Sequence, residues 1–125
     1  MSKVLVIGGG AAGMFAAIFA AYNGNEVHIF EKNEKLGKKL FITGKGRCNI
    51  TNASDMDTLF ASVVTNPKFY TVVFTVMTIR IVIEFFERIG VRTKVERGNR
   101  VFPVSDHSSD VIGALTKELH QLGVS

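Results

Sequence analysis

The pattern of apolar and polar residues predicts a strand, a helix and a second strand at the start of the chain. Residues 3–8 are almost entirely apolar, as in a strand buried within a parallel sheet. Residues 11–23 are rich in alanine and predict a helix that stops at Asn23-Gly24. Residues 26–31 predict the second strand. This order predicts a βαβ unit with parallel strands, and therefore an α/β fold.

The residues that follow predict a loop and a further helix. Residues 32–56 are rich in Gly, Lys, Asn and Thr and predict a loop, with a short helix near Lys35–Leu40. Ser54 or Asp55 can cap a helix that continues to about Val64.

Two later stretches, residues 82–89 and 111–122, have apolar residues at helical spacing, and each is stopped by a glycine. Between them, residues 91–95 and 100–104 predict a small β-hairpin that turns at Arg97-Gly98-Asn99.

A glycine motif lies between the first predicted strand and the first helix. It is Gly8-x-Gly10-x-x-Gly13, and Glu31 ends the second strand at the distance of about 20 residues expected for a dinucleotide-binding fingerprint. Gly8 permits the tight turn, Gly10 lets the backbone approach a pyrophosphate, and Gly13 lets the helix pack on the strand. The N-terminus of the helix favours phosphate groups. Glu31 can accept hydrogen bonds from a ribose diol. Because its carboxylate would repel a 2′-phosphate, Glu31 favours FAD or NAD over NADP. The alternative is a glycine turn without a ligand, in which Glu31 is a solvated carboxylate.

The length and composition fit one domain with a substantial core. The chain has 125 residues, of which 46% are hydrophobic, and a net charge of +4. Its basic residues cluster in 32–47 and 88–100, and we attribute the first cluster to an anionic cofactor rather than to nucleic acid. The single Cys48 excludes an intrachain disulfide and is typical of the cytoplasm. The apolar residues 71–79 are too few to span a membrane, so we expect neither a membrane nor a nucleic-acid partner.

Two further sets of motifs resemble a known family. They are Leu36-Gly-Lys-Lys39 with Thr43-Gly-Lys-Gly-Arg-Cys-Asn-Ile-Thr-Asn52, and Glu96-Arg-Gly-Asn-Arg-Val-Phe-Pro-Val-Ser-Asp106 with Ser108-Ser-Asp-Val111. They resemble the N-terminal part of the BaiN-like NAD(P)/FAD-dependent oxidoreductases, a bacterial flavoprotein family also labelled the aminoacetone oxidase family. The resemblance covers almost the whole chain. It implies a Rossmann-like FAD-binding fold and a flavin that takes hydride from NAD(P)H and passes it to a small-molecule substrate or to oxygen.

The resemblance also implies that the segments carrying these motifs lie along FAD. Lys38 and Lys39 can neutralise the pyrophosphate, Gly44 and Gly46 let the loop approach a flat ring, and Arg47 can bind phosphate or flavin oxygens. The alternatives are a solvated loop for the two lysines and a surface ion pair for Arg47. The predicted cofactor-binding residues are Gly8, Gly10, Ala11, Ala12, Gly13, Glu31, Lys32, Lys38, Lys39, Gly44, Gly46, Arg47, Cys48 and Asn49.

Cys48 itself has two interpretations. It is either a thiol that lies beside the flavin or a small buried filler, which free cysteine often is. No second cysteine offers a disulfide shuttle, so we favour the filler. No pattern of His, Cys and carboxylates predicts a metal site, and no residue can be assigned as a catalytic acid or base.

Residues 70–81 depart from the family, although both flanks match it. The segment is β-branched and apolar where the family is polar, aromatic and helical. One explanation is a pair of compensating frameshifts. A possible set of codons for Thr71 onward, regrouped one base earlier, encodes Tyr-Ser-Gly-Phe-Tyr-Ser-Tyr-Asp-Asn-Gln-Asp, which is close to the family. Whatever its origin, the segment has low helix propensity and no polar face, so we expect poor packing there.

Family members are much longer than this chain. The resemblance implies that residues 1–125 are the N-terminal part of an FAD-binding domain, that the rest of that domain and the substrate domain are absent, and that Val124 begins a further strand. We therefore expect weak FAD binding and no efficient turnover by the chain alone. The alternatives are a non-catalytic nucleotide-binding module and a nonfunctional fragment of a frameshifted gene.

Overall fold

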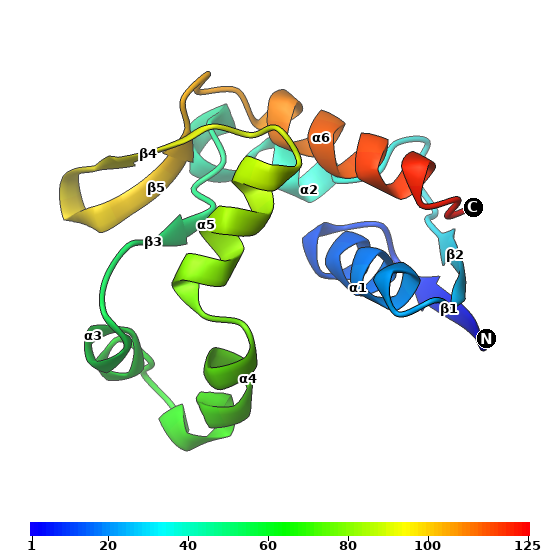
Figure 1. Ribbon diagram of the computed structural model, residues 1–125. Helices are drawn as coiled ribbons and strands as arrows, with labels where there is room; N and C mark the ends of the chain where they lie inside the picture. Colours follow the sequence, from blue (N-terminus) through cyan, green and yellow to red (C-terminus); the bar gives the residue numbers. More distant parts are fainter. The chain divides into compact units, whose positions relative to one another are not determined.

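The computed structural model describes the backbone of residues 1–125 and the side chains of residues 1–74 and 76–125 (Figure 1). The chain divides into two compact units. The first contains Met1–Cys48 and Ser105–Ser125, and the second contains Asn49–Val104.

The first unit contains the predicted βαβ arrangement. Strand β1 (Lys3–Ile7) leads into helix α1 (Ala11–Tyr22) and then into strand β2 (Glu26–Phe30). The two strands are parallel and pair from Lys3 opposite Glu26 to Ile7 opposite Phe30. The prediction of an α/β fold with parallel strands is confirmed, and each element begins at its predicted residue and ends one residue earlier than predicted.

The last residue extends this sheet on the β2 side. The N–H of Ile29 donates to the carbonyl oxygen of Ser125 at 2.7 Å, and the N–H of Ser125 donates to Val27 at 3.2 Å. Strand hydrogen bonding therefore begins one residue after the predicted Val124. The position beside β2, opposite β1, is that of the third strand in a Rossmann sheet.

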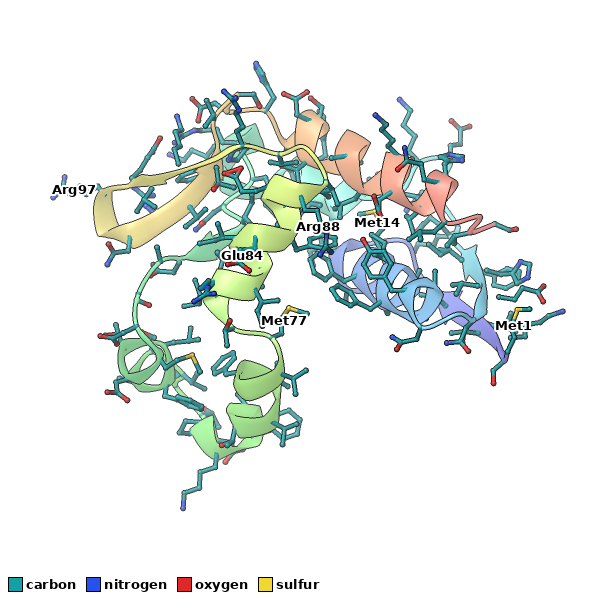
Figure 2. The ribbon with its side chains drawn as sticks, in the orientation of Figure 1. Met1, Met14, Met77, Glu84, Arg88 and Arg97 are labelled. Atoms are coloured by element: carbon teal, nitrogen blue, oxygen red, sulfur yellow. The ribbon has the colours of Figure 1, made fainter. Side chains whose placement is uncertain are left out.

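Two helices pack together in this unit, α1 and α6 (Ser108–Gln121). Met14, labelled on α1 in Figure 2, has no exposed surface, and neither have Ala17 and Ile18. Helix α6 buries Val111, Leu115 and Leu119, the stripe that its helical spacing predicts. On the other face of β1, Leu5 and Ile7 are 57% and 81% exposed.

A short helix, α2 (Lys38–Phe41), follows β2, and the 3₁₀ turn η1 (Thr43–Gly46) comes next. The helix was expected near Lys35–Leu40, and it begins later because Gly37 at its N-terminal end is left-handed, with φ of 71°.

The second unit combines an antiparallel sheet with short helices. Its three strands, in the order β3-β5-β4, are β3 (Thr51–Asn52), β5 (Arg100–Pro103) and β4 (Thr93–Glu96). Strands β4 and β5 form the predicted hairpin through η3 (Arg97–Asn99), and Figure 2 shows Arg97 at its tip. The helical elements are α3 (Met56–Ala61), η2 (Pro67–Tyr70), α4 (Thr71–Val76) and α5 (Ile79–Arg88).

Helix α3 confirms one predicted cap and corrects one predicted end. The Asp55 side chain accepts the Thr58 N–H at 2.7 Å, as expected for an N-cap. The helix ends at Ala61 rather than near Val64 because the β-branched residues 63–65 have low helix propensity.

Residues 70–81, the segment that departs from the family, include the last residue of η2, all of α4 and the first turn of α5. Val72, Val73 and Val76 of α4 are 71%, 50% and 68% exposed, so the poor packing expected for this segment is confirmed. Among the described residues, no single helix is long and apolar enough to cross a membrane, although the bent pair Pro67–Phe74 and Ile79–Arg88 meets the length and composition criteria together.

Candidate functional site

The glycine loop between β1 and α1 has the backbone that its sequence predicts. Gly8 has φ of +98°, a conformation that favours glycine, and its N–H donates to Phe30 on β2 at 2.8 Å. A Cβ atom on Gly13 would overlap the carbonyl oxygen of Gly8 and lie 3.4 Å from Cγ1 of Val6. Gly8 therefore serves the turn, and Gly13 serves the packing of α1 on β1.

Gly10 differs from these two glycines because the protein itself does not require it. Its φ of −81° and ψ of −168° suit any residue, and a Cβ atom there would meet nothing within 4 Å. Gly10 is the N-cap of α1, and no side chain caps this helix end, where Ala11 and Ala12 are exposed. The space beside Gly10 and the uncapped N–H groups fit an anionic group at the helix N-terminus.

Glu31, just beyond β2, is held against this loop. Its Oε1 accepts the N–H of Gly9 at 2.8 Å, and its Oε2 accepts the N–H of Asn33 at 2.7 Å. These two backbone donors, Asn33 first, hold the pKa of the Glu31 carboxyl below its ordinary value. The side chain is therefore an ionised, oriented carboxylate beside the glycine loop.

Gly9 was missed in the sequence because the fingerprint leaves its position free. The residue is buried, and a Cβ atom there would overlap Cδ2 of Leu36 and lie 3.3 Å from Cβ of Glu31. Its carbonyl oxygen also accepts the Gly37 N–H at 2.7 Å. The run of three consecutive glycines was the available sequence signal.

The basic loop after β2 forms a hollow with the start of α6. The hollow has a volume of about 730 Å³ and combines lysines with an apolar floor. It is lined by Lys32, Asn33, Glu34, Lys35, Leu36, Gly37, Lys38, Phe41, Ser109, Ile112 and Gly113. Two of the predicted cofactor-binding residues, Lys32 and Lys38, line this hollow. Lys39 is exposed and is not among the lining residues.

Arg47 has a protein partner. Its Nε and Nη2 donate to Oδ1 of Asp106 at 2.9 Å and 2.7 Å. The guanidinium is 33% exposed and the carboxylate is 41% exposed. The ion pair is one of the two alternatives for Arg47, and a role toward the cofactor stays a prediction.

Cys48 is buried, with 2% of its surface exposed, and burial raises the pKa of its thiol. These properties fit the small buried filler. Gly44 and Gly46 before it have φ of 57° and 84°, so the backbone alone favours glycine at both positions. Asn49 opens the second unit and is exposed. In the described part of the chain, no three His, Cys, Asp or Glu side chains are placed to hold a metal ion.

Comparison with known proteins gives one family and several oxidoreductase relatives. The family model described as the HI0933-like protein Rossmann domain matches residues 2–125. The 3-dehydro-bile acid delta(4,6)-reductase of Clostridium scindens is 37% identical over 124 residues, covering 97% of this chain and 29% of that relative. The bilirubin reductase of Mediterraneibacter gnavus is 58% identical over 40 residues, covering 32% of this chain and 6% of that relative. The chain thus spans less than a third of the length of these relatives.

The fold also has a counterpart among solved structures. The crystal structure of Thermovibrio ammonificans THI4 superposes with a TM-score of 0.64 and covers 98% of this chain and 36% of that chain. At 14% identity the likeness shows the fold alone. Together with the family match, the geometry of the glycine loop indicates a site for a dinucleotide cofactor.

Proposed function

Because the chain belongs to the HI0933-like Rossmann domain family, we propose that it binds the ADP half of FAD and is the cofactor-binding portion of a flavin-dependent oxidoreductase. Gly10 and the first turn of α1 hold the pyrophosphate, and Glu31 accepts hydrogen bonds from the ribose diol. FAD, when bound, supplies hydride transfer between NAD(P)H and a small-molecule substrate. We propose that the protein acts in the cytoplasm, because a single cysteine without a disulfide partner is typical of proteins in that reducing compartment.

The main support for this proposal is that a Cβ atom on Gly10 would have no protein atom within 4 Å. Gly8, Gly9 and Gly13 each have a reason within the protein to be glycine, whereas Gly10 has an ordinary backbone and open space beside it. Since a side chain there would disturb nothing in the protein, a ligand that approaches the backbone explains the glycine. The uncapped start of α1 makes that ligand an anion.

Glu31 supports a ribose without a 2′-phosphate. A carboxylate has about four acceptor sites, and the N–H groups of Gly9 and Asn33 use two of them, one on each oxygen. The remaining sites suit two ribose hydroxyl donors, whereas a 2′-phosphate would meet an ionised carboxylate. The proposed cofactor is therefore FAD, with NAD more compatible than NADP at the same site.

Two lysines add positive charge to the hollow beside the glycine loop. Lys32 and Lys38 are exposed and line the hollow beside Leu36 and Gly37, the residues that contact Gly9. Their proposed role is to screen the negative charge of a bound nucleotide. Lys39, Gly44, Gly46, Arg47, Cys48 and Asn49 stay proposals that depend on the family resemblance.

Calorimetric titration of the purified chain tests the proposal. We expect ADP and FAD to bind, with NADP at least about tenfold weaker because its 2′-phosphate faces Glu31. Gly10→Val and Glu31→Ala should each weaken ADP binding, and Glu34→Ala, which removes an exposed carboxylate three residues away, should not. Equal ADP affinity in the native chain, Gly10→Val and Glu31→Ala would refute the proposed site.

A second candidate is a nonfunctional product of a frameshifted gene, which the exposed valines of α4 favour. In that case the purified chain would aggregate and ignore ADP, FAD and NAD. Sequencing of the gene separates the two origins, because the hypothesis requires the alternate-frame codons between Phe69 and Val82.

A further inference from the structure

We infer that the hollow between the basic loop and the start of α6 is a second binding site, which takes a small aromatic anion. The hollow has a volume of about 730 Å³, and sites for small molecules range over roughly 300–1,000 Å³. Its walls come from residues 32–38, Phe41 and the first two turns of α6, all within the first unit. An apolar floor with a few charged groups around it is the usual chemistry of a site for an organic ligand.

Gly113 is the residue that points most directly to a ligand in the hollow. It lies in the interior of α6 with a helical backbone, where glycine lowers the stability of a helix relative to alanine. A Cβ atom on Gly113 would meet nothing within 4 Å. The protein therefore has no reason of its own for this glycine, whereas a flat ligand that lies against the helix backbone in the hollow explains it.

The apolar floor of the hollow fits an aromatic ring. Leu36, Phe41 and Ile112 supply it. Phe41 is 53% exposed, so it presents apolar surface on which a ligand ring can stack. The carbonyl oxygen of Phe41 accepts the hydroxyl of the buried Ser108 at 2.6 Å, and this bond ties α2 to the α6 helix beside it (Figure 1). The two sides of the hollow are therefore joined before any ligand binds.

The charged residues of the hollow favour an anion. Lys32, Lys35 and Lys38 line it, and Glu34 is the one carboxylate among the described lining residues, so the lining has a net charge of +2. The three lysines are exposed, so their ammonium groups stay hydrated while their stems extend the apolar wall. In the part of the chain that the structure describes, Lys35 and Lys38 have no ion-pair partner, whereas Lys32 also interacts electrostatically with Glu31. An acidic substituent on the ring would supply the opposite charge.

The hollow is distinct from the glycine loop. Its described lining includes neither Glu31 nor any residue of Gly8–Gly13. Leu36 and Gly37 lie between the hollow and the loop, because Leu36 occupies the space beside Gly9 and the N–H of Gly37 donates to the carbonyl oxygen of Gly9. The inference therefore does not depend on the proposed function, although the lysines at 32 and 38 can act on both ligands.

Fluorescence titration of the purified chain with 1-naphthyl phosphate tests the inference. The sequence has no tryptophan, so the naphthyl emission reports binding without that background. We expect 1-naphthyl phosphate to bind at least about tenfold more tightly than inorganic phosphate, because its ring is removed from water. It should bind about two- to fivefold more tightly than 1-naphthol, because the lysines attract the phosphate.

Gly113→Ala gives a result that unfolding could not imitate. The urea midpoint should rise, because alanine stabilises the interior of a helix. Binding of 1-naphthyl phosphate should weaken at least about fivefold, because the new Cβ takes space that the ligand occupies.

Two substitutions with matched controls test the wall and the floor. Lys35→Ala and Phe41→Ala should each weaken 1-naphthyl phosphate binding about two- to fivefold. Lys117→Ala and Phe30→Ala are the controls and should bind it like the native chain. Lys117 is an exposed lysine of α6, Phe30 is 55% exposed, and both lie in the same unit outside the lining.

Titration with ADP separates this site from the one proposed at the glycine loop. Gly10→Val should leave 1-naphthyl phosphate binding unchanged, and Gly113→Ala and Lys35→Ala should leave ADP binding unchanged. The inference is overturned if 1-naphthyl phosphate binds no better than inorganic phosphate or if Gly113→Ala binds it like the native chain. It is also overturned if Gly113→Ala weakens ADP binding equally, since the hollow would then be part of the nucleotide site. A native chain that binds 1-naphthyl phosphate but not ADP would refute the proposed function alone.

Discussion

The backbone N–H of Gly9 donates a 2.8 Å hydrogen bond to Oε1 of Glu31, and this bond joins the glycine loop to the residue that follows β2. The same carboxylate also accepts the Asn33 N–H through its other oxygen. Glu31 therefore has two tasks, because it fixes the loop and keeps acceptor sites for a ligand. Gly9 must stay small for this contact, since Leu36 and Glu31 occupy the space of a side chain.

The two fingerprint glycines Gly10 and Gly13 should give opposite results when changed to alanine. Gly13→Ala forces a Cβ onto the carbonyl oxygen of Gly8, so we expect the free energy of unfolding to fall by about 1–3 kcal/mol. Gly10→Ala meets nothing within 4 Å and should leave the stability within about 0.5 kcal/mol of native while weakening ADP binding. Urea unfolding and calorimetry measure the two effects. Loss of stability in Gly10→Ala would show that the protein, and not a ligand, requires that glycine.

The Glu31 carboxylate should stabilise the folded chain at neutral pH and lose that effect in acid. Its folded pKa is lowered by the N–H groups of Asn33 and Gly9, so its contribution is present above the unfolded glutamate pKa of about 4.3 and disappears as the pH falls through the lower folded value. Glu31→Gln should therefore lower the urea midpoint at neutral pH and converge on the native midpoint in acid. Glu34→Gln is the control, and the difference between its urea midpoint and that of the native chain should not disappear in acid in this way. Parallel pH profiles for the native chain and Glu31→Gln would contradict the assignment.

Local patterns were sufficient to predict the βαβ unit, the hairpin and α6. Their periods, glycine stops and caps act over a few residues, as at Asp55, which caps α3 as its sequence suggested. Helix α2 begins at Lys38 and not near Lys35 because Gly37 is left-handed, and the N–H of Gly37 donates to Gly9, which is distant in sequence. Helix α3 ends at Ala61, before the predicted end near Val64, because the β-branched residues 63–65 have low helix propensity.

The partners within the candidate site were harder to predict. The sequence placed Gly8, Gly10, Gly13 and Glu31 in one loop region because the fingerprint spacing encodes it. It could not pair Arg47 with Asp106, which are 59 residues apart, since such a contact is set by the return of the chain into the first unit. Nor could it identify Leu36 as the side chain that makes Gly9 obligatory.

The ion pair between Arg47 and Asp106 offers a test of the predicted role of Arg47. Asp106 has φ of 61°, a conformation that asparagine also tolerates, so Asp106→Asn should preserve the backbone. Because both side chains are about one-third or more exposed, we expect a stability change below about 1 kcal/mol. If Arg47 serves the cofactor, releasing it from Asp106 should strengthen FAD binding, and Arg47→Ala should weaken it. FAD fluorescence titration measures the affinities of the native chain, Asp106→Asn and Arg47→Ala. Identical FAD affinities in these three proteins would contradict a role of Arg47 in cofactor binding.

The Cys48 thiol should react slowly in the folded chain. It is 2% exposed and burial raises its pKa, so little thiolate is accessible at neutral pH. We expect modification by iodoacetamide, followed by mass spectrometry, to be at least about tenfold slower in the native chain than in urea. Unfolded chain at the same pH is the control. A native rate equal to the rate in urea would contradict the buried filler and favour a thiol open to the cofactor.

Residues 70–81 allow a test of the frameshift hypothesis in the protein itself. Replacing these twelve residues with the eleven of Tyr-Ser-Gly-Phe-Tyr-Ser-Tyr-Asp-Asn-Gln-Asp removes the exposed valines of α4 and Arg80, adds two carboxylates and shortens the chain by one residue, so the chain should self-associate less. Sedimentation velocity measures the association, and thermal unfolding measures the stability. The control is Val72→Thr with Val76→Thr, which lowers the apolar surface but keeps the present backbone sequence. If the alternate-frame segment truly belongs to this fold, it should raise the unfolding midpoint above that of the control, because its residues then make contacts that the valines cannot make. A replaced chain that is less stable than the threonine control would argue that the present residues are the native ones.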